Sequence, residues 1–200
     1  FYNMLLSAMA YTERIFESLD EKPDICEIPG AVEMPAIKGT VEFRKLYFGY
    51  ESDRPVLKNV SFKVCAGENI ALVGPTGAGK TTIVNIISRF YDIQKGEVLI
   101  DGIDIRNATL RSLRRQMGIM MQDTFIFSGT IMDNIRYGRL DATDDEVIKA
   151  AKSVYADEFI SKLKNGYETE VNERGSMLST GERQLLSFAR VILADPRILI

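Results

Sequence analysis

The chain has 200 residues, of which 46% are hydrophobic and 26% are charged, and its net charge is −3. This composition is that of an ordinary globular domain, so it excludes a disordered or fibrous protein. The slight acidic balance gives no basic footprint for nucleic acid, and two distant cysteines without any histidine give no framework for zinc. We therefore expect one folded domain, or one and a part, with no nucleic-acid partner.

Residues 1–22 carry apolar side chains at helical spacing, among them Leu5, Met9 and Phe16. The pattern fits an amphipathic helix that packs on the domain surface. It fits equally well the end of a membrane-spanning helix, because "FYNMLLSAMAY" is apolar over about half the length that a bilayer requires. The first residue is not Met, and we expect further residues before it.

The linker at residues 23–39 is recognised by its composition. Three of the six prolines and two glycines lie within "DEKPDICEIPGAVEMPAIKG". Proline removes a backbone donor and interrupts helices, so this stretch is predicted to be an extended connection. We expect the folded domain to begin at residue 40.

The next part of the chain alternates or clusters apolar residues at strand spacing. "TVEFRKLYFGY" and "VSFKV" predict strands, and "GEVLIDGIDI" predicts two strands around an Asp-Gly turn, which together form an antiparallel flank. "NIALVG" is a continuous apolar run that predicts a buried strand. The helix predicted after it, "KTTIVNIISRF", places Ile83, Ile86, Ile87 and Phe90 on one face.

The later part is predicted to be mainly helical. Thr143 and Glu146 have capping-box spacing at the start of one helix, and a second helical piece runs through Phe159 to Leu163 and ends at Gly166. A further helix is expected from about residue 181 to 194, followed by "RILI" as the start of an apolar strand.

The strongest chemical signal is "GPTGAGKT", which matches G-x-x-x-x-G-K-[ST] without a mismatch. Glycines let successive amides converge on phosphate oxygens, and the helix that follows adds the positive end of its dipole. Lys80 is expected to reach the β- and γ-phosphates, and the Thr81 hydroxyl to bind Mg²⁺. The alternative is a glycine turn that merely ends a strand. The nucleotide-binding residues predicted here are Gly74, Thr76, Gly77, Ala78, Gly79, Lys80, Thr81 and Thr82.

The order of further motifs around this loop resembles the ATPase domain of ATP-binding cassette (ABC) transporters. Tyr50 precedes the loop, Gln122 follows an apolar strand, and "LSTGERQ" precedes a helix and a strand. Taken singly, these motifs fit a strand aromatic, a polar strand end and a helix N-cap. The resemblance implies an α/β fold with a P-loop NTPase core, an antiparallel β flank and an α-helical subdomain at about residues 123–180 of a domain spanning 40–200.

The same resemblance implies roles for individual residues. Tyr50 would stack on adenine, with Val56 also at the nucleotide. Gln122 would sense Mg²⁺ and the attacking water, which makes it catalytic together with Lys80. Two domains would meet head to tail, as a homodimer or a heterodimer, so that the signature loop of one grips the ATP of the other. The signature residues assigned to that contact are Ser179, Thr180, Gly181 and Glu182.

Two stretches are similar to exporter-type members of the family. "TEVNERG" resembles the segment that contacts the coupling helices of a membrane domain, with Thr169, Val171 and Glu173 as the matching residues. Residues 1–22 then correspond to the end of the last transmembrane helix, and the ATPase domain would lie on the cytoplasmic side of the cell membrane. The expected function is ATP-driven export, with ATP and Mg²⁺ as cofactors.

Departures from the family pattern keep other functions open. Glu182 stands where the family has glutamine, which places a carboxylate near an anionic ligand. The chain stops at Ile200, before the acidic end of the expected Walker B strand, so the fold is expected to be incomplete at the C-terminus. We expect these residues alone to hydrolyse ATP negligibly. The alternatives are a soluble ABC-type ATPase not coupled to transport and a non-hydrolytic ATP-binding fragment.

Overall fold

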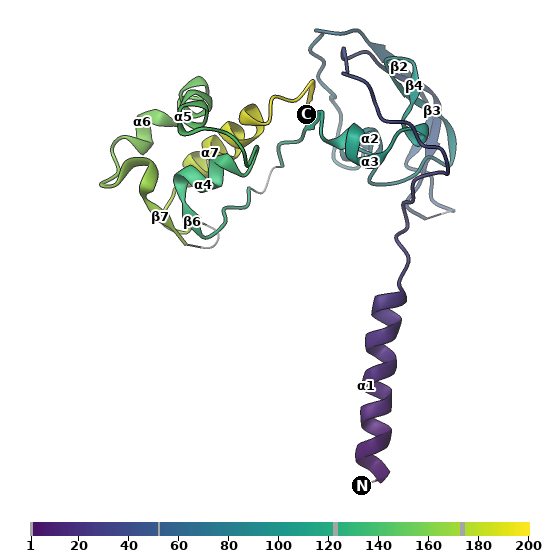
Figure 1. Cartoon of the computed structure of the whole chain (residues 1–200). Helices are drawn as coiled ribbons and strands as arrows, with labels where there is room; N and C mark the ends of the chain where they lie inside the picture. The colour runs from purple at the N-terminus through teal and green to yellow at the C-terminus, as the bar shows by residue number, and fades with distance from the viewer. Residues whose placement is uncertain (1, 52, 122–123, 173–174) are drawn as a thin grey trace.

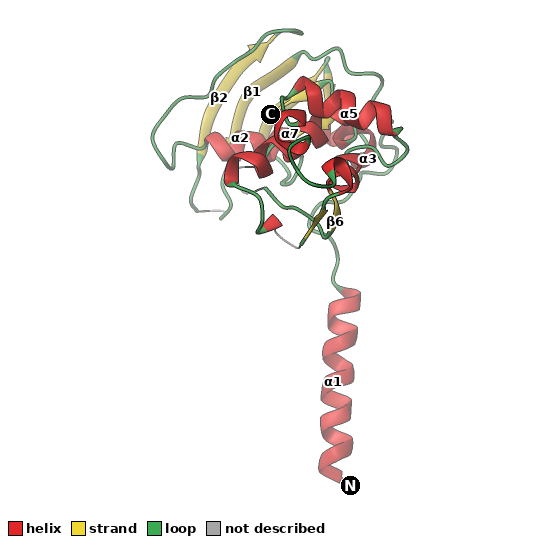
Figure 2. Ribbon diagram, turned by 90° about the vertical axis from the view of Figure 1, so that its left-hand side faces the viewer, coloured by secondary structure: helices red, strands yellow, loops and turns green. Residues whose placement is uncertain are grey.

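The computed structural model describes residues 2–51, 53–121, 124–172 and 175–200. Two lobes lie side by side, and a long helix, α1 (Tyr2–Asp20), extends away from them (Figure 1). One lobe contains an antiparallel sheet with short helices, and the other is mainly helical (Figures 1 and 2). Each lobe has its own buried apolar cluster, and the two clusters have no residue in common.

Four antiparallel strands form the sheet of the first lobe, in the order β2, β1, β3, β4. On its buried face, Phe43 stacks on Phe62 with ring centroids 4.5 Å apart. Between β3 and β4, Asp101 and Gly102 have φ values of 50° and 84°, as a type I′ turn requires. The predicted Asp-Gly hairpin and antiparallel flank are therefore confirmed. The strands are β1 (Val41–Phe48), β2 (Leu57–Val64), β3 (Lys95–Ile100) and β4 (Ile103–Asp104).

The helix after the glycine-rich loop, α2 (Lys80–Ile87), is shorter than predicted. It was expected to continue to Phe90, but Phe90 is 44% exposed and lies beyond the helix. Arg89 ends the helix, because its φ is 50° and its amide donates to Ile86 O at 2.9 Å, while the Phe90 amide donates to Asn85 O at 2.9 Å. Glycine is usual in such a turn, and the left-handed backbone costs another residue about 1–2 kcal/mol.

The apolar segment 69–73 is not a strand in this structure, contrary to the prediction. Ile70 is 55% exposed and Val73 is 92% exposed. A parallel strand takes its hydrogen bonds from strands at its sides, and none of the described strands pairs with this segment. The segment borders an apolar hollow of about 590 Å³, which the sheet, α2 and residues 197–200 also line. The pattern identified a segment suited to a strand, but pairing decides whether a strand forms.

A short pair of parallel strands brings together the segments that enter and leave the helical lobe. It consists of β5 (Met117–Gly118) and β8 (Ile198–Leu199), and the Ile200 amide extends it by donating to Gly118 O at 2.8 Å. The strand predicted at "RILI" is therefore present as Ile198–Leu199, and the apolar strand expected before Gln122 is present only as Met117–Gly118.

The helical lobe uses side chains to cap its helices. Thr143 and Glu146 form the predicted capping box, and Thr130 and Asp133 form another. Hydrogen bonds from the Thr143 amide and hydroxyl lower the pKa of Glu146, and those from the Thr130 hydroxyl and amide lower the pKa of Asp133. The elements are β6 (Gly129–Thr130), α4 (Ile131–Arg136), α5 (Asp144–Ser153), α6 (Asp157–Ile160), η2 (Gly166–Glu168), β7 (Glu170–Val171) and α7 (Thr180–Leu193).

The second helical piece of this lobe is shorter than predicted. The α-helix ends at Ile160, and the chain continues through tighter turns, in which Leu163 N donates to Ile160 O and Gly166 N to Leu163 O, both at 3.1 Å. The final helix, α7, agrees with the prediction to within one residue at each end.

Residues 23–39, called the strap below, form an extended segment that is held against the first lobe. The Asp101 carboxylate accepts hydrogen bonds from the amides of Lys38 at 2.6 Å and Thr40 at 2.9 Å. The Gln116 side chain accepts one from the Ile37 amide at 2.8 Å. The strap is also held beside η1 (Ile105–Asn107) and α3 (Leu110–Arg114), so the predicted linker is a fixed part of this lobe.

Helix α1 stands apart from both lobes (Figure 2), and no residue of it is buried. The alternative in which this helix packs on the domain surface is therefore wrong for this structure. Within the described residues, no helix has both the length and the apolar character needed to cross a membrane.

We expect that replacing Gly138 with alanine will strongly destabilise the helical lobe. A Cβ at this position would lie 2.0 Å from the carbonyl oxygen of Arg190 on α7, and a backbone atom cannot move away as a flexible side chain can. Overpacking of this kind costs about 3 kcal/mol, which lowers the melting temperature of a chain of this size by roughly 6–12 °C. Circular dichroism during heating of the purified chain measures the change.

Gly181→Ala is the matched control for this prediction. A Cβ on Gly181 would meet nothing within 4 Å, so the same chemical change should leave the melting temperature nearly unaltered. Equal melting temperatures for Gly138→Ala and Gly181→Ala would show that the contact between α4 and α7 is wrongly described.

Candidate functional site: two phosphate-type loops on two lobes

The loop Gly74–Thr82 leads into the first turn of α2. Gly77 and Gly79 have φ values of 83° and 89°, where another residue would be strained. A Cβ on Gly79 would lie 2.7 Å from Leu57 Cδ2, so glycine also permits close packing here. The first amides of a helix have no partner within the helix and carry the positive end of its dipole. The loop therefore ends on a helix terminus suited to an anion, as the motif predicted.

Lys80 is the first residue of α2, and its ammonium group folds back over the loop. Its Nζ donates hydrogen bonds to Gly74 O at 2.8 Å and Pro75 O at 2.9 Å. Both acceptors are neutral carbonyls, whereas a phosphate oxygen is charged and binds an ammonium group more strongly. The flexible stem of lysine lets the ammonium exchange these partners for a phosphate in the loop.

Two threonines follow Lys80 and face different surroundings. The Thr81 side chain is exposed beside the loop, and Thr82 is buried. The described residues contain no group of three acidic, cysteine or histidine side chains suited to a metal. Mg²⁺ at nucleotide sites is held by few protein ligands together with phosphates and water, so a lone exposed hydroxyl at Thr81 fits this ion.

Tyr50 lies beside this loop, although 30 residues separate it from Lys80 in the sequence. Its hydroxyl donates to Thr82 Oγ1 at 3.2 Å and accepts from Asn85 Nδ2 at 3.1 Å. The ring contacts Tyr91 edge-on, with centroids 4.9 Å apart, and remains 49% exposed. The predicted base-stacking residue is therefore next to the phosphate loop with part of its ring uncovered.

Sequence reasoning missed Asn85 and Tyr91, which orient Tyr50. The signal for Asn85 was its position three residues after Thr82, on the polar side of a helix whose opposite face is apolar. Val56 also lies at this site, since its Cγ1 is 3.4 Å from the Cβ position of Gly79.

The second loop, residues 178–182, lies at the start of α7 in the helical lobe. The Ser179 hydroxyl accepts from the Glu182 amide at 3.3 Å, and the Glu182 carboxylate accepts from the Ser179 amide at 2.7 Å. Ser179, Thr180 and Gly181 are exposed. The N-cap reading is therefore confirmed, and the unusual Glu182 directs its charge toward its own helix terminus. Arg183, which the prediction did not include, braces the loop by donating to Leu178 O at 2.6 Å and Thr180 Oγ1 at 3.1 Å.

The two loops belong to different lobes and different cores (Figure 1). The loop before α2 rests on the sheet cluster, and Leu186 anchors α7 in the helical cluster. The residues of each loop are thus brought together by one lobe, and neither loop completes the other.

Of the remaining predicted residues, Gln122 and Glu173 lie outside the described residues. Val171 is placed by the pairing of β7 with β6, in which it lies opposite Gly129, and Thr169 directly precedes β7. The Ile131 amide donates to Thr169 O at 3.1 Å, and Val171 is buried. The backbone of this segment is therefore fixed against the start of α4.

Sequence reasoning missed an aromatic cluster in the helical lobe, whose residues flank β6 and α4 in the sequence. Phe127 contacts Phe125 and Tyr137 with ring centroids 4.9 and 4.5 Å away, and the three rings are partly exposed. The Arg190 guanidinium lies 5.3 Å from the Phe127 centroid. Burial lowers the pKa of Arg190, but arginine starts so far above neutrality that it stays charged. The exposed rings, two of which (Phe127 and Tyr137) lie against the Arg190 guanidinium, form a surface suited to a protein partner.

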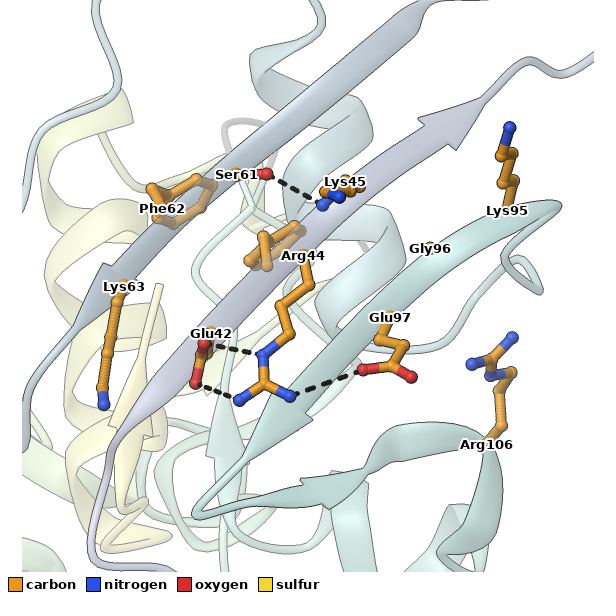
Figure 3. A pocket seen from close by; sticks show the side chains of 11 residues that line it. Glu42, Arg44, Lys45, Ser61, Phe62, Lys63, Lys95, Gly96, Glu97 and Arg106 are labelled. Carbon is orange, nitrogen blue, oxygen red and sulfur yellow. Dashed lines mark hydrogen bonds and ion pairs between the residues drawn. The ribbon is translucent and has the colours of Figure 1, made fainter.

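A separate hollow of about 830 Å³ lies on the outer face of the sheet (Figure 3). Arg44 crosses it and pairs with Glu42 at 2.7 Å and Glu97 at 3.6 Å. Its lining includes no residue of the phosphate loop or of the signature loop. The ion pairs are exposed and the hollow is open, so we do not assign a ligand to it.

Comparison with known proteins agrees with this geometry. A family model described as ABC transporter matches residues 57–200. The chain is 58% identical over 199 residues to an uncharacterised ABC transporter ATP-binding protein of Bacillus subtilis (strain 168). It is 46% identical over 198 residues to an ATP-dependent lipid A-core flippase of Syntrophus aciditrophicus (strain SB). These matches cover 100% and 99% of this chain but 33% of each relative, so the chain spans about a third of their length.

A solved structure is also similar over almost the whole chain. It is that of a bacterial Atm1-family ABC exporter with ATP bound, with a TM-score of 0.93 and 41% sequence identity. The similarity covers 99% of this chain and 35% of that one. Together with the family model, which matches well over half of the residues, these findings establish that the chain belongs to the ABC transporter family as an ATP-binding domain of the kind found in exporters.

Proposed function

We propose that this chain is the domain that binds and hydrolyses ATP in an ABC exporter. The observation that carries the proposal is the loop Gly74–Thr82, where left-handed glycines, a lysine ammonium group and a helix terminus converge beside an exposed tyrosine. The parent protein would use the energy of hydrolysis to move a substrate across a membrane. The similarity to a lipid A-core flippase and to an Atm1-family exporter supports that reading.

Each group at the loop has a defined task in this proposal. Lys80 exchanges its two carbonyl partners for phosphate oxygens and offsets the charge that develops during phosphoryl transfer. The Thr81 hydroxyl would bind Mg²⁺, which neutralises charge on the β- and γ-phosphates. Gln122 would orient the attacking water. Tyr50 would cover the base with the uncovered part of its ring.

The signature loop would serve the nucleotide of a second domain. Its exposed Ser179 and Gly181 lie at a helix terminus on a lobe separate from the phosphate loop, so the chain presents two half-sites on different lobes. A head-to-tail pair of such domains, identical or not, would close two ATP sites. Closure and reopening of this pair would be the motion that hydrolysis drives.

The membrane domain would be joined in two places. Helix α1 would continue a transmembrane helix, because it stands clear of both lobes with its apolar side chains exposed. The segment with Thr169, Val171 and Glu173, together with the aromatic cluster at Phe127, would receive the coupling helices. The ATPase domain would then lie on the cytoplasmic side of the cell membrane.

We expect Tyr50→Ala to weaken ATP binding about tenfold, because stacking of a base on an aromatic ring contributes about 1–3 kcal/mol. Tyr50→Phe should retain most of the affinity, since it keeps the ring and loses only the hydroxyl contacts with Thr82 and Asn85. Equilibrium titration of the chain with a fluorescent ATP analogue gives both values.

Tyr155→Ala provides the control, because Tyr155 is exposed in the helical lobe and belongs to neither loop. It should bind like the unaltered chain. Unchanged affinity in Tyr50→Ala would refute the base-stacking role, and absence of binding in every variant would refute the proposed function.

A further inference from the structure

Arg89 combines two features that each cost free energy. Its side chain is only 1% exposed, and its backbone has a φ of 50°. A buried charge is unfavourable unless it is paired and fully hydrogen-bonded, and glycine would form the same turn without strain. Two costs at one residue indicate that the side chain has a task which the turn itself does not require.

The guanidinium group connects α2 to other parts of the first lobe. Its Nη2 donates to Cys26 O in the strap at 3.1 Å. Its Nη1 donates to Ile105 O at 3.3 Å and Ala108 O at 3.1 Å, and its Nε pairs with Asp92 at 3.0 Å. Three of these four acceptors are backbone carbonyls, so the link depends on the forked shape of arginine.

Arg89 also contacts residues 105–108, and this turn forms a second attachment point for the strap. The Val32 amide donates to Asn107 O at 2.8 Å, and the Thr109 amide donates to Val32 O at 2.9 Å. Arg89 therefore contacts the strap directly at Cys26 and indirectly through the turn that pairs with Val32. The strap in turn leads to α1 without another helix between them.

The phosphate loop and Arg89 lie at opposite ends of the same helix. α2 extends from Lys80 to Ile87, and at 1.5 Å per residue it is about 12 Å long. The backbone hydrogen bonds of α2 connect its first turn, where a phosphate would bind, to the closing turn that contains Arg89.

We propose that Arg89 is a positioning residue that connects nucleotide occupancy of the loop to the strap, and through the strap to α1. This inference rests on the proposed function, because it takes MgATP as the ligand of the loop. Binding at the start of α2 steadies Arg89, which fixes the strap at Cys26 and at the turn paired with Val32. The strap is then part of the transmission between ATPase domain and α1, and not a passive tether.

Hydrogen–deuterium exchange of strap peptides, with and without MgATP, tests the proposal on the chain. In the unaltered chain, MgATP should slow exchange of the Val32 and Met34 amides by about fivefold. Arg89→Gly keeps the turn and relieves its strain, yet it should abolish this ATP-dependent difference. Arg89→Lys should abolish it too, because one ammonium group cannot span the three carbonyls. ATP affinity, measured in the same samples, should stay within about twofold in both variants.

Asp92→Asn is the matched control. It removes the negative charge but keeps a side-chain oxygen as acceptor for Nε, and the three bonds to carbonyls remain, so the ATP-dependent difference should persist. Circular dichroism shows whether each variant is folded. If one Arg89 variant is unfolded, the exchange data of the other variant test the proposal. A normal ATP-dependent difference in a folded Arg89 variant, or none in an unaltered chain that binds ATP, would overturn the inference. An unaltered chain that does not bind ATP at all would instead overturn the proposed function.

Discussion

Replacement of Lys80 by alanine should reduce ATP hydrolysis by about a thousandfold in the full-length protein that carries this chain. The ammonium group is the fixed positive charge nearest to the phosphate-binding turn, and its present partners are two neutral carbonyls. Charge accumulates on the phosphoryl oxygens in the transition state, so loss of this group raises the barrier more than it weakens binding. Steady-state release of inorganic phosphate by the purified protein measures the effect.

Lys149→Ala is a suitable control, because Lys149 is an exposed lysine on α5 in the other lobe. It removes the same charge and should leave turnover unchanged. A folded Lys80→Ala protein with normal turnover would contradict the assignment of Gly74–Thr82 as the phosphate loop.

Two inactive variants should restore activity to each other when they are mixed in one dimer. Lys80→Ala damages the phosphate loop, and Gly181→Asp damages the signature loop by adding a carboxylate where a phosphate would approach. In a head-to-tail homodimer of these two variants, one site receives both lesions and the other receives neither. In the isolated mixed dimer, and with independent sites, about half of the normal hydrolysis should return.

Gly181→Asp suits this experiment because it should not disturb the fold. A Cβ on Gly181 meets nothing within 4 Å, and an acidic residue in the first turn of a helix is favourable. Its effect on hydrolysis would therefore come from the ligand and not from unfolding. Coexpression of differently tagged copies, followed by two-step purification, isolates the mixed dimer. Two measurements on that dimer decide the matter: hydrolysis of ATP and trapping of bound nucleotide. If neither is recovered, both loops act within one chain, and the head-to-tail arrangement is wrong.

Features set by neighbouring residues could be predicted from the sequence. The Asp101-Gly102 hairpin and the Thr143–Glu146 capping box formed where expected, because their geometry depends on side chains within a few positions. The turn of Gly77 and Gly79 into α2 was predictable for the same reason. The motif specifies both the positive φ values and the helix terminus.

Features set by distant partners could not be predicted. The segment 69–73 has the apolar pattern of a strand, but a strand also needs neighbours to pair with. The prolines of the strap indicated an extended backbone, while its hold on the first lobe depends on Asp101 and Gln116, more than 60 positions away. Arg89 gave no local signal, since its partners come from three separate stretches of the chain.

The separation of the two cores has a genetic consequence if the domains pair head to tail. A substitution that loosens the helical lobe, such as one at Gly138, leaves the phosphate loop of its own chain on an intact core. The damage falls on the ATP site of the partner copy, which borrows the weakened signature loop. In a cell that expresses both alleles, such a lesion would act in trans, and wild-type copies in mixed pairs would lose function. Recessive behaviour would be expected instead for variants that never fold well enough to pair.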